Sequence, residues 1–169
     1  MREHYDLEDR SGTKLGEAER NLSPMYPAKF VVTGASGLEA MHISARPASL
    51  RNQFTFYDAA GAELGTIRRK LAKFFGEEFW IEKNGVEFMR IYGNSSRHDY
   101  QMQIRGIQVA SVHEKRVSNP YQMFGFLQDF MSTILEISIM GDADHRVVIG
   151  AVIVIEHLKT EGRTVSPGD

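Results

Sequence analysis

Near the C-terminus the chain contains an uninterrupted apolar run, and its conformation limits which folds are open to the rest of the sequence. Every residue from Val147 to Ile155 is apolar, and all of them except Gly150 and Ala151 are Val or Ile. β-Branched residues favour strands, and a strand this apolar needs cover on both faces. As an α-helix the run rises only about 13 Å, well short of the roughly 30 Å hydrocarbon core of a bilayer. A membrane span is therefore the weakest of three interpretations.

The residues that flank this run favour a helix. Asp142 and Asp144 precede it, which suits the positive end of a helix dipole. His157 and Lys159 follow it, which suits the negative end, and Gly162 lies where a C-terminal cap is expected. A helix that is apolar on every side must be enclosed by protein. The local sequence thus leaves two interpretations open, a doubly covered strand and an enclosed helix.

Most of the remaining chain alternates apolar and polar residues over short stretches. Tyr100, Met102 and Ile104 share one face of an expected strand, and residues 54–57 and 135–139 alternate in the same way. Turn signals separate the stretches at 58–61, 84–85, 92–96 and 105–106. Asn84-Gly85 is the best hairpin turn, because both residues tolerate positive φ in a type I′ turn. Short strands with frequent turns predict an antiparallel sandwich or barrel.

Composition limits the class of protein further. The 169 residues are 42% hydrophobic and 25% charged, as in ordinary globular domains, and the formal net charge is −2. That charge gives no basic field for nucleic acid. The chain has no cysteine, which excludes disulfides and Cys-ligated metals. The N-terminal sequence has no apolar signal segment, so we expect a cytoplasmic protein.

The two ends of the chain are polar. Residues 1–24 offer little apolar surface to offset the entropy of ordering, so we expect them to form a flexible arm. Residues 161–169 predict a flexible tail for the same reason. A single folded domain is then expected over residues 25–160.

Three stretches carry a family resemblance: "FTFYDAAGAELGTIRRK", "FWIEKNGVEFMRI" and "YQMQIRGIQVASVHEKRVS". Each is strand-like, with a glycine-bearing turn and basic residues at or after its end. The closing "ILEISIMGDADHRVVIGAVIVIEHL" adds a strand, an acidic residue and an apolar segment that ends at Glu156. Over residues 26–160 this layout resembles LURP-one-related proteins and their phospholipid scramblase relatives. The resemblance implies the tubby-like fold, a closed antiparallel β-barrel of about twelve strands around one C-terminal hydrophobic helix, here about residues 145–159.

Several motifs share features with catalytic or cofactor sites but lack the context that such sites need. The glycines of "VVTGASGLEA" (31–40) are typical of a dinucleotide-binding turn, but no amphipathic helix follows, so a hairpin loop is expected. Asp142 and Asp144 lack the spacing of a Ca²⁺ loop and predict a turn and an N-cap. The six histidines have no metal-ligand spacing. We therefore expect no enzyme activity, no cofactor and no metal.

Two segments are candidates for binding. Four basic residues lie close together beside Phe74 and Phe75, and the tubby-like resemblance implies phosphoinositide binding through such a basic patch. We predict that this patch binds anionic phospholipid at the cytoplasmic membrane surface, with a solvated strand end as the simpler interpretation. Its residues are Arg68, Arg69, Lys70 and Lys73.

The second candidate is the aromatic segment 121–131. With Phe124, Phe126 and Phe130 it is either a surface that contacts a protein partner or cover for one end of the core. A protein-interaction module without a lipid role is thus the alternative function. Scramblase-like activity is a third, which the resemblance invites. An enclosed helix argues against it, because that helix cannot also insert into a bilayer.

Overall fold

The computed structural model describes residues 4–21, 28–45, 53–70, 77–94, 98–115 and 134–164. Its described part forms one antiparallel sheet of eleven strands and a single helix. The strands are β1 (His4–Glu8), β2 (Lys14–Asn21), β3 (Lys29–Gly34), β4 (Glu39–Ala45), β5 (Gln53–Asp58), β6 (Glu63–Lys70), β7 (Glu77–Lys83), β8 (Val86–Asn94), β9 (Asp99–Ile104), β10 (Ile107–Lys115) and β11 (Ile134–Ile139). The helix is α1 (His145–Thr164).

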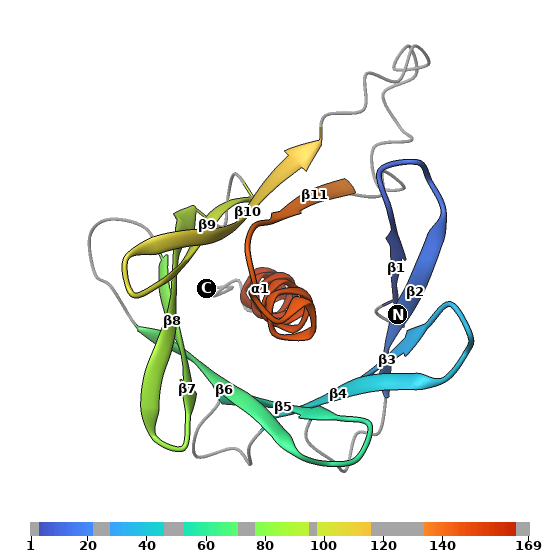
Figure 1. Ribbon diagram of the computed structural model, residues 1–169, viewed down its shortest axis with the longest axis horizontal. Helices are drawn as coiled ribbons and strands as arrows, with labels where there is room; N and C mark the ends of the chain where they lie inside the picture. The colour runs from blue at the N-terminus through green and yellow to red at the C-terminus, as the bar shows by residue number, and fades with distance from the viewer. Residues whose placement is uncertain are drawn as a thin grey trace, which may run out of the picture.

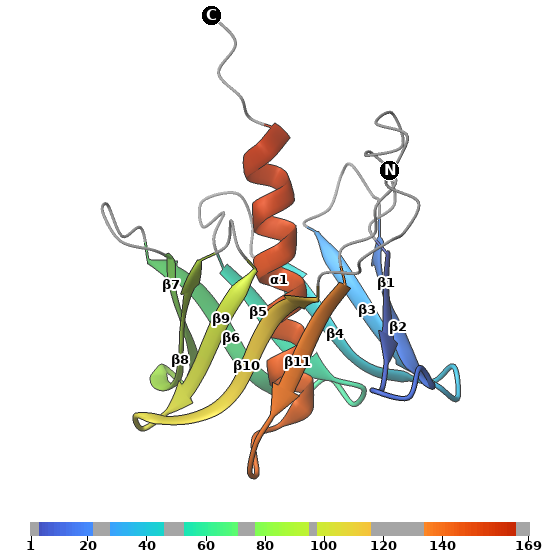
Figure 2. The ribbon, with the colours of Figure 1, turned by 90° about the horizontal axis from the view of Figure 1, so that it is seen from above.

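The sheet is a meander that curls around the helix. Each strand pairs with its neighbours in sequence, so the spatial order runs from β1 to β11 without a crossover. Figure 1 shows the curled sheet surrounding α1, and Figure 2 shows α1 extending beyond the strand ends. The edge strands β1 and β11 are not paired with each other within the ranges given above. A mainly β fold with one enclosed helix is thus confirmed, whereas closure of the sheet into a barrel is not.

The meander gives the molecule two distinct ends. The short turns of the five hairpins, from β1–β2 to β9–β10, all lie at one end, which we call the hairpin end. Because β11 runs in the same direction as β1, α1 starts at the hairpin end and finishes at the opposite end, called the far end. Figure 2 shows this course of the helix through the sheet.

The predicted type I′ turn at Asn84-Gly85 is present between β7 and β8. Asn84 has φ of 53° and Gly85 has φ of 75°, and Lys83 pairs with Val86 across the turn. The glycine-bearing segment 31–40 also forms a hairpin, since it contains the end of β3, a turn and the start of β4. The sequence prediction of a hairpin loop there is confirmed.

The core lies between the inner face of the sheet and α1. Cross-strand partners point to the same face, and pairs such as Phe54 with Ile67 and Ile91 with Met102 are almost fully buried. The expected inward face of β9 is confirmed by Tyr100 and Met102.

The apolar run Val147–Ile155 lies within α1, so it is helical, and it is buried over nearly its whole length. Val148, Ala151 and Val154 have no exposed surface. The expectation of an enclosed helix is confirmed, although α1 ends at Thr164 rather than at residue 159. A Cβ on Gly150 would lie 2.8 Å from Met41 Cε and 3.2 Å from Phe56 Cδ1, so this glycine lets the helix approach β4 and β5 closely.

The expectation of a flexible arm over residues 1–24 is wrong for residues 4–21, which form β1 and β2 and pair with β3. Tyr5, Leu7 and the fully buried Ala18 pack toward the core, while charged residues occupy the other face. The low apolar content of residues 4–21 does not prevent them from forming strands, because a strand that is covered on one face needs few apolar residues. The expected tail is also wrong at its start, since residues 161–164 belong to α1.

Candidate functional site

The basic cluster on β6 is divided between the two faces of the sheet. Arg68 pairs with Trp80 on the outer face, whereas Arg69 pairs with the buried Phe79 on the inner face. Successive residues of a strand point to opposite faces, so these two guanidinium groups do not share a surface. Lys70 ends the strand, and Lys73 lies outside the described residues, as do Phe124, Phe126 and Phe130. The structure therefore separates Arg68 from Arg69, and the patch as a whole stays a prediction from the sequence.

Arg68 already has protein partners on the outer face. Its Nε lies 3.0 Å from Oε2 of Glu82, whose Oε1 accepts a hydrogen bond from Trp80 Nε1 at 2.8 Å. With its amide oxygen turned toward Arg68, the buried Gln53 also accepts from that guanidinium, at 2.6 Å from Nε. These contacts hold the charge of Arg68 within a cross-strand network over β5, β6 and β7. Arg68 is thus positioned as a structural residue of the sheet.

A second cluster joins the C-terminal part of α1 to the start of β9. His98 Nδ1 lies 3.0 Å from a carboxylate oxygen of Glu156, and Lys159 Nζ lies 2.6 Å from His98 Nε2. The side chains of His98 and Glu156 are only 11% and 13% exposed. Because a carboxylate can only accept, His98 donates from Nδ1 to Glu156, while the Lys159 ammonium lies beside the ring, 2.9 Å from Nδ1 as well as close to Nε2.

This cluster ties the helix to the sheet. His98 is held by Glu156 and Lys159, both of which belong to α1, so the three side chains form one polar contact between the helix and the sheet. The sequence marked Glu156 as the end of the apolar segment and His98 as one of six scattered histidines, but it did not connect them. The two residues are 58 positions apart, and only the curl of the sheet brings them together.

Among the described residues, His4, Asp6 and Glu17 place three potential metal ligands within 4.8 Å of one another. Lys14 contacts two of these residues, since its Nζ lies 2.6 Å from Glu17 Oε2 and 3.3 Å from Asp6 Oδ1. The hydrogen bonds to Glu17 and Asp6 raise the pKa of Lys14, which stays cationic. The ammonium group of Lys14 therefore already pairs with both carboxylates of this group.

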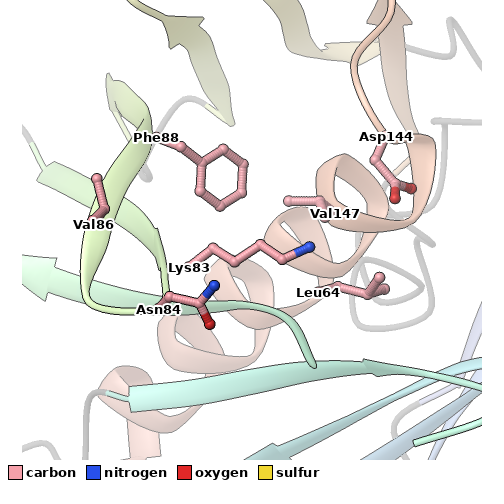
Figure 3. Close-up of a pocket in the computed structure, with 7 residues that line it drawn as sticks. All are labelled: Leu64, Lys83, Asn84, Val86, Phe88, Asp144 and Val147. Atoms are coloured by element: carbon pink, nitrogen blue, oxygen red, sulfur yellow. The ribbon is translucent and has the colours of Figure 1, made fainter. Parts of the chain in front are cut away.

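A pocket of about 390 Å³ opens at the hairpin end, between the β7–β8 hairpin and the start of α1. Its walls are mostly aliphatic and aromatic, with polar groups at only a few positions (Figure 3). The lining residues are Leu64, Lys83, Asn84, Val86, Phe88, Asp144 and Val147. Apolar walls with a few polar groups are typical of small-molecule sites, and the volume lies within their usual range.

The two charged residues of this pocket have different surroundings. Asp144 forms a bidentate ion pair with Arg146, at 3.0 Å to Nε and 2.7 Å to the terminal nitrogen. The side chain of Lys83 has no hydrogen bond or ion pair with any residue that the structure describes. Its side chain extends across the pocket toward α1 (Figure 3). Within the described part of the chain, the charge of the pocket that lacks a partner is therefore positive and belongs to Lys83.

Asp144 also caps the helix, as the sequence predicted. Its Oδ1 accepts a hydrogen bond from the backbone N–H of Arg146 at 2.9 Å, and the Val148 N–H donates to its carbonyl oxygen at 3.2 Å. Hydrogen bonds from the Arg146 side chain, followed by those from the backbone, lower the pKa of Asp144 from its ordinary value of 3.8.

This lowered pKa predicts how acid affects the fold. The Asp144 carboxylate contributes stability above pH 3.8 that is lost as the pH falls through the lower pKa of the folded state. Asp144→Asn keeps an acceptor for the cap but cannot titrate. We expect the variant to be less stable near pH 7, by up to about 1 kcal/mol because the ion pair is partly exposed, and to lose less stability in acid. Urea midpoints from neutral pH to about pH 3 test this, and parallel profiles would contradict it.

The hairpin end also carries exposed apolar side chains. Among the described large hydrophobic residues that are exposed, all but Tyr92 and Ile134 lie at this end, on separate hairpins or beside the start of α1. We call them the apolar rim: Leu15, Leu38, Val86, Ile107 and Met140. Leu38 and Ile107 are 72% and 70% exposed.

Three cations lie among the rim residues. Arg10 and Arg105 sit in exposed turns and Lys83 at the end of β7, and none of them makes an ion pair with the part of the chain described here. The acidic side chains of these turns are engaged locally. Asp9 accepts from Ser11 and Thr13, and these hydrogen bonds lower its pKa. Arg10, Lys83 and Arg105 therefore lie at the same end of the domain as the apolar rim, and this end also carries the exposed carboxylates Glu8 and Asp142.

Comparison with known proteins assigns no family. No protein-family model, curated protein or solved structure matches this chain. The LURP-one resemblance therefore stays a prediction from the sequence. Within the described residues, no helix has both the length and the apolar character needed to cross a membrane.

Proposed function

We propose that this chain is a non-catalytic domain of the LURP-one and tubby-like type that binds anionic phospholipid at the cytoplasmic membrane surface. In this proposal its sheet closes into a barrel of about twelve strands, which would remove the exposed strand edges. The uninterrupted meander and the helix along its axis support this architecture.

The hairpin end supports lipid binding better than the basic cluster on β6 does. Apolar side chains on separate turns can enter the interfacial region of a bilayer, while cations beside them attract anionic headgroups. The presence of the apolar rim and of Arg10, Lys83 and Arg105 at the same end of the domain is the observation that carries the proposal. Scramblase-like activity is not favoured, because the sheet surrounds the one described apolar helix.

Co-sedimentation with vesicles tests this proposal. The wild type is mixed with phosphatidylcholine vesicles with and without phosphatidylserine, at low and at physiological salt. We expect pelleting that requires phosphatidylserine and weakens with salt, since exposed charges are screened. Arg10→Gln/Lys83→Gln/Arg105→Gln and Leu38→Glu/Ile107→Glu should each lose most of the binding. Circular dichroism would show that both variants fold.

Two control variants locate the lipid-binding surface. Lys29→Gln/Lys115→Gln removes exposed cations at the far end and should leave pelleting unchanged. Lys70→Glu/Lys73→Glu changes the basic cluster without breaking the Arg68–Glu82 pair. If only this variant loses binding, the site is the cluster predicted from the sequence. If no condition pellets the wild type, lipid binding is wrong, and capture of a protein partner becomes the next experiment.

A further inference from the structure

The pocket at the hairpin end has features that a flat membrane-contact surface does not need. It is a concave space of about 390 Å³ beside the apolar rim, with Leu64 and Val147 forming part of its inner wall. Leu64 is 8% exposed and Val147 is 3% exposed, so the wall belongs to the core of the domain. Apolar walls of this kind favour an aliphatic ligand, because each buried methylene group adds favourable transfer free energy.

The charges around the pocket define the ligand further. Asp144 is matched by Arg146, and its second role is to cap α1. Lys83 has no partner in the described part of the chain, and its side chain extends into the same space (Figure 3). An ammonium group on an apolar wall attracts an anion more strongly than one in open water does. Asn84, next to it in the turn, adds an amide that can donate to the same anion.

We infer that this pocket holds a single aliphatic chain that ends in an anionic group, with Lys83 binding the anion. The inference rests on the proposed lipid-binding function and names the ligand class. The volume of the pocket lies near the lower limit for small-molecule sites, which suits one aliphatic chain better than two. The anion is a carboxylate or a phosphate, and it comes from a free fatty acid in solution or from a single-chain lipid in a membrane.

Displacement of a fluorescent fatty acid by dodecanoate tests the inference without any membrane, at concentrations where dodecanoate is monomeric. We expect saturable displacement by dodecanoate, at least tenfold weaker displacement by dodecanol, and none by acetate. Lys83→Met should weaken dodecanoate binding about tenfold, as expected for the loss of a charge-assisted hydrogen bond. Val86→Asp places a negative charge on the exposed lining of the pocket and should also weaken binding.

Arg105→Gln is the matched control, because it removes an exposed cation on the neighbouring hairpin that does not line the pocket. It should leave dodecanoate binding unchanged while reducing vesicle pelleting. Equal affinity for Lys83→Met and the wild type, or no displacement by dodecanoate, would overturn the pocket assignment. The proposal of membrane binding would not be affected by that result, because vesicle pelleting tests it separately.

One more comparison identifies the source of the aliphatic ligand. Phosphatidylcholine vesicles with and without lysophosphatidic acid are compared with dodecanoate in solution. Pelleting that is stronger with lysophosphatidic acid than with phosphatidylserine at equal surface charge, and that loses this difference in Lys83→Met, indicates a membrane lipid as the ligand. Displacement by dodecanoate without such pelleting indicates a free fatty acid.

Discussion

Ala151→Asp is expected to abolish or nearly abolish folding. Ala151 lies within α1, has no exposed surface, and follows the glycine whose Cα faces Met41 and Phe56. A carboxylate placed there must be buried among apolar side chains or be protonated, and either outcome costs several kcal/mol. Because domains of this size are stable by only about 5–15 kcal/mol, we expect a loss of at least about 4 kcal/mol.

Urea denaturation followed by circular dichroism and by the fluorescence of Trp80, the only tryptophan, measures this effect. His145→Asp is the control, since residue 145 is exposed in the first turn of α1, where a negative charge suits the dipole. Its stability should stay within about 0.5 kcal/mol of the wild type. Ala151→Ser offers a milder change if the aspartate variant cannot be purified. An Ala151→Asp protein with an unchanged urea midpoint would contradict enclosure of the helix by the sheet.

Glu156→Ala should have the next largest effect, a loss of about 2–3 kcal/mol. Removing this carboxylate leaves the His98 Nδ1–H without its acceptor and removes the negative charge beside Lys159. Breaking a fully buried ion pair costs about 3–5 kcal/mol, and the slight exposure of this cluster lowers the expected value. Glu156→Gln should cost less, because its amide oxygen still accepts from His98.

A double-mutant cycle separates the cluster from simple loss of packing. Lys159→Met removes the ammonium group but keeps an apolar side chain at the position. If the cluster acts as a unit, Glu156→Ala in the Lys159→Met background should cost at least about 0.5 kcal/mol less than in the wild type. Additive losses would show that the two residues do not interact, and would contradict the role of the cluster in tying α1 to β9.

The sequence was a good guide wherever local periodicity decides the structure. Alternation placed Tyr100 and Met102 on the buried face of β9, and Asn84-Gly85 formed the expected turn. The same alternation also predicts that Arg68 and Arg69 point to opposite faces, because consecutive strand residues cannot share a face. The division of the basic cluster on β6 is therefore a property of its local sequence, and strand periodicity is sufficient to predict it.

Other features depended on partners that are far away in the sequence. The polar composition of residues 4–21 concealed two strands, since their outer faces are charged and their inner faces carry small or few apolar groups. Lys83 is an ordinary exposed lysine in the sequence. It becomes a candidate binding residue only because the start of α1 lies across the pocket from the β7–β8 hairpin.

The sequence by itself determined the positions of most strands and turns, and it determined that the run from Val147 to Ile155 must be covered on every side. It did not determine whether that run is strand or helix, because β-branched propensity and flanking charges favour opposite answers. The tertiary structure decided this, since a sheet curled around an axis buries all sides of a helix at once. It also decided which polar side chains meet, because the Arg68–Glu82 ion pair and the hydrogen bond between His98 and Glu156 form between separate elements.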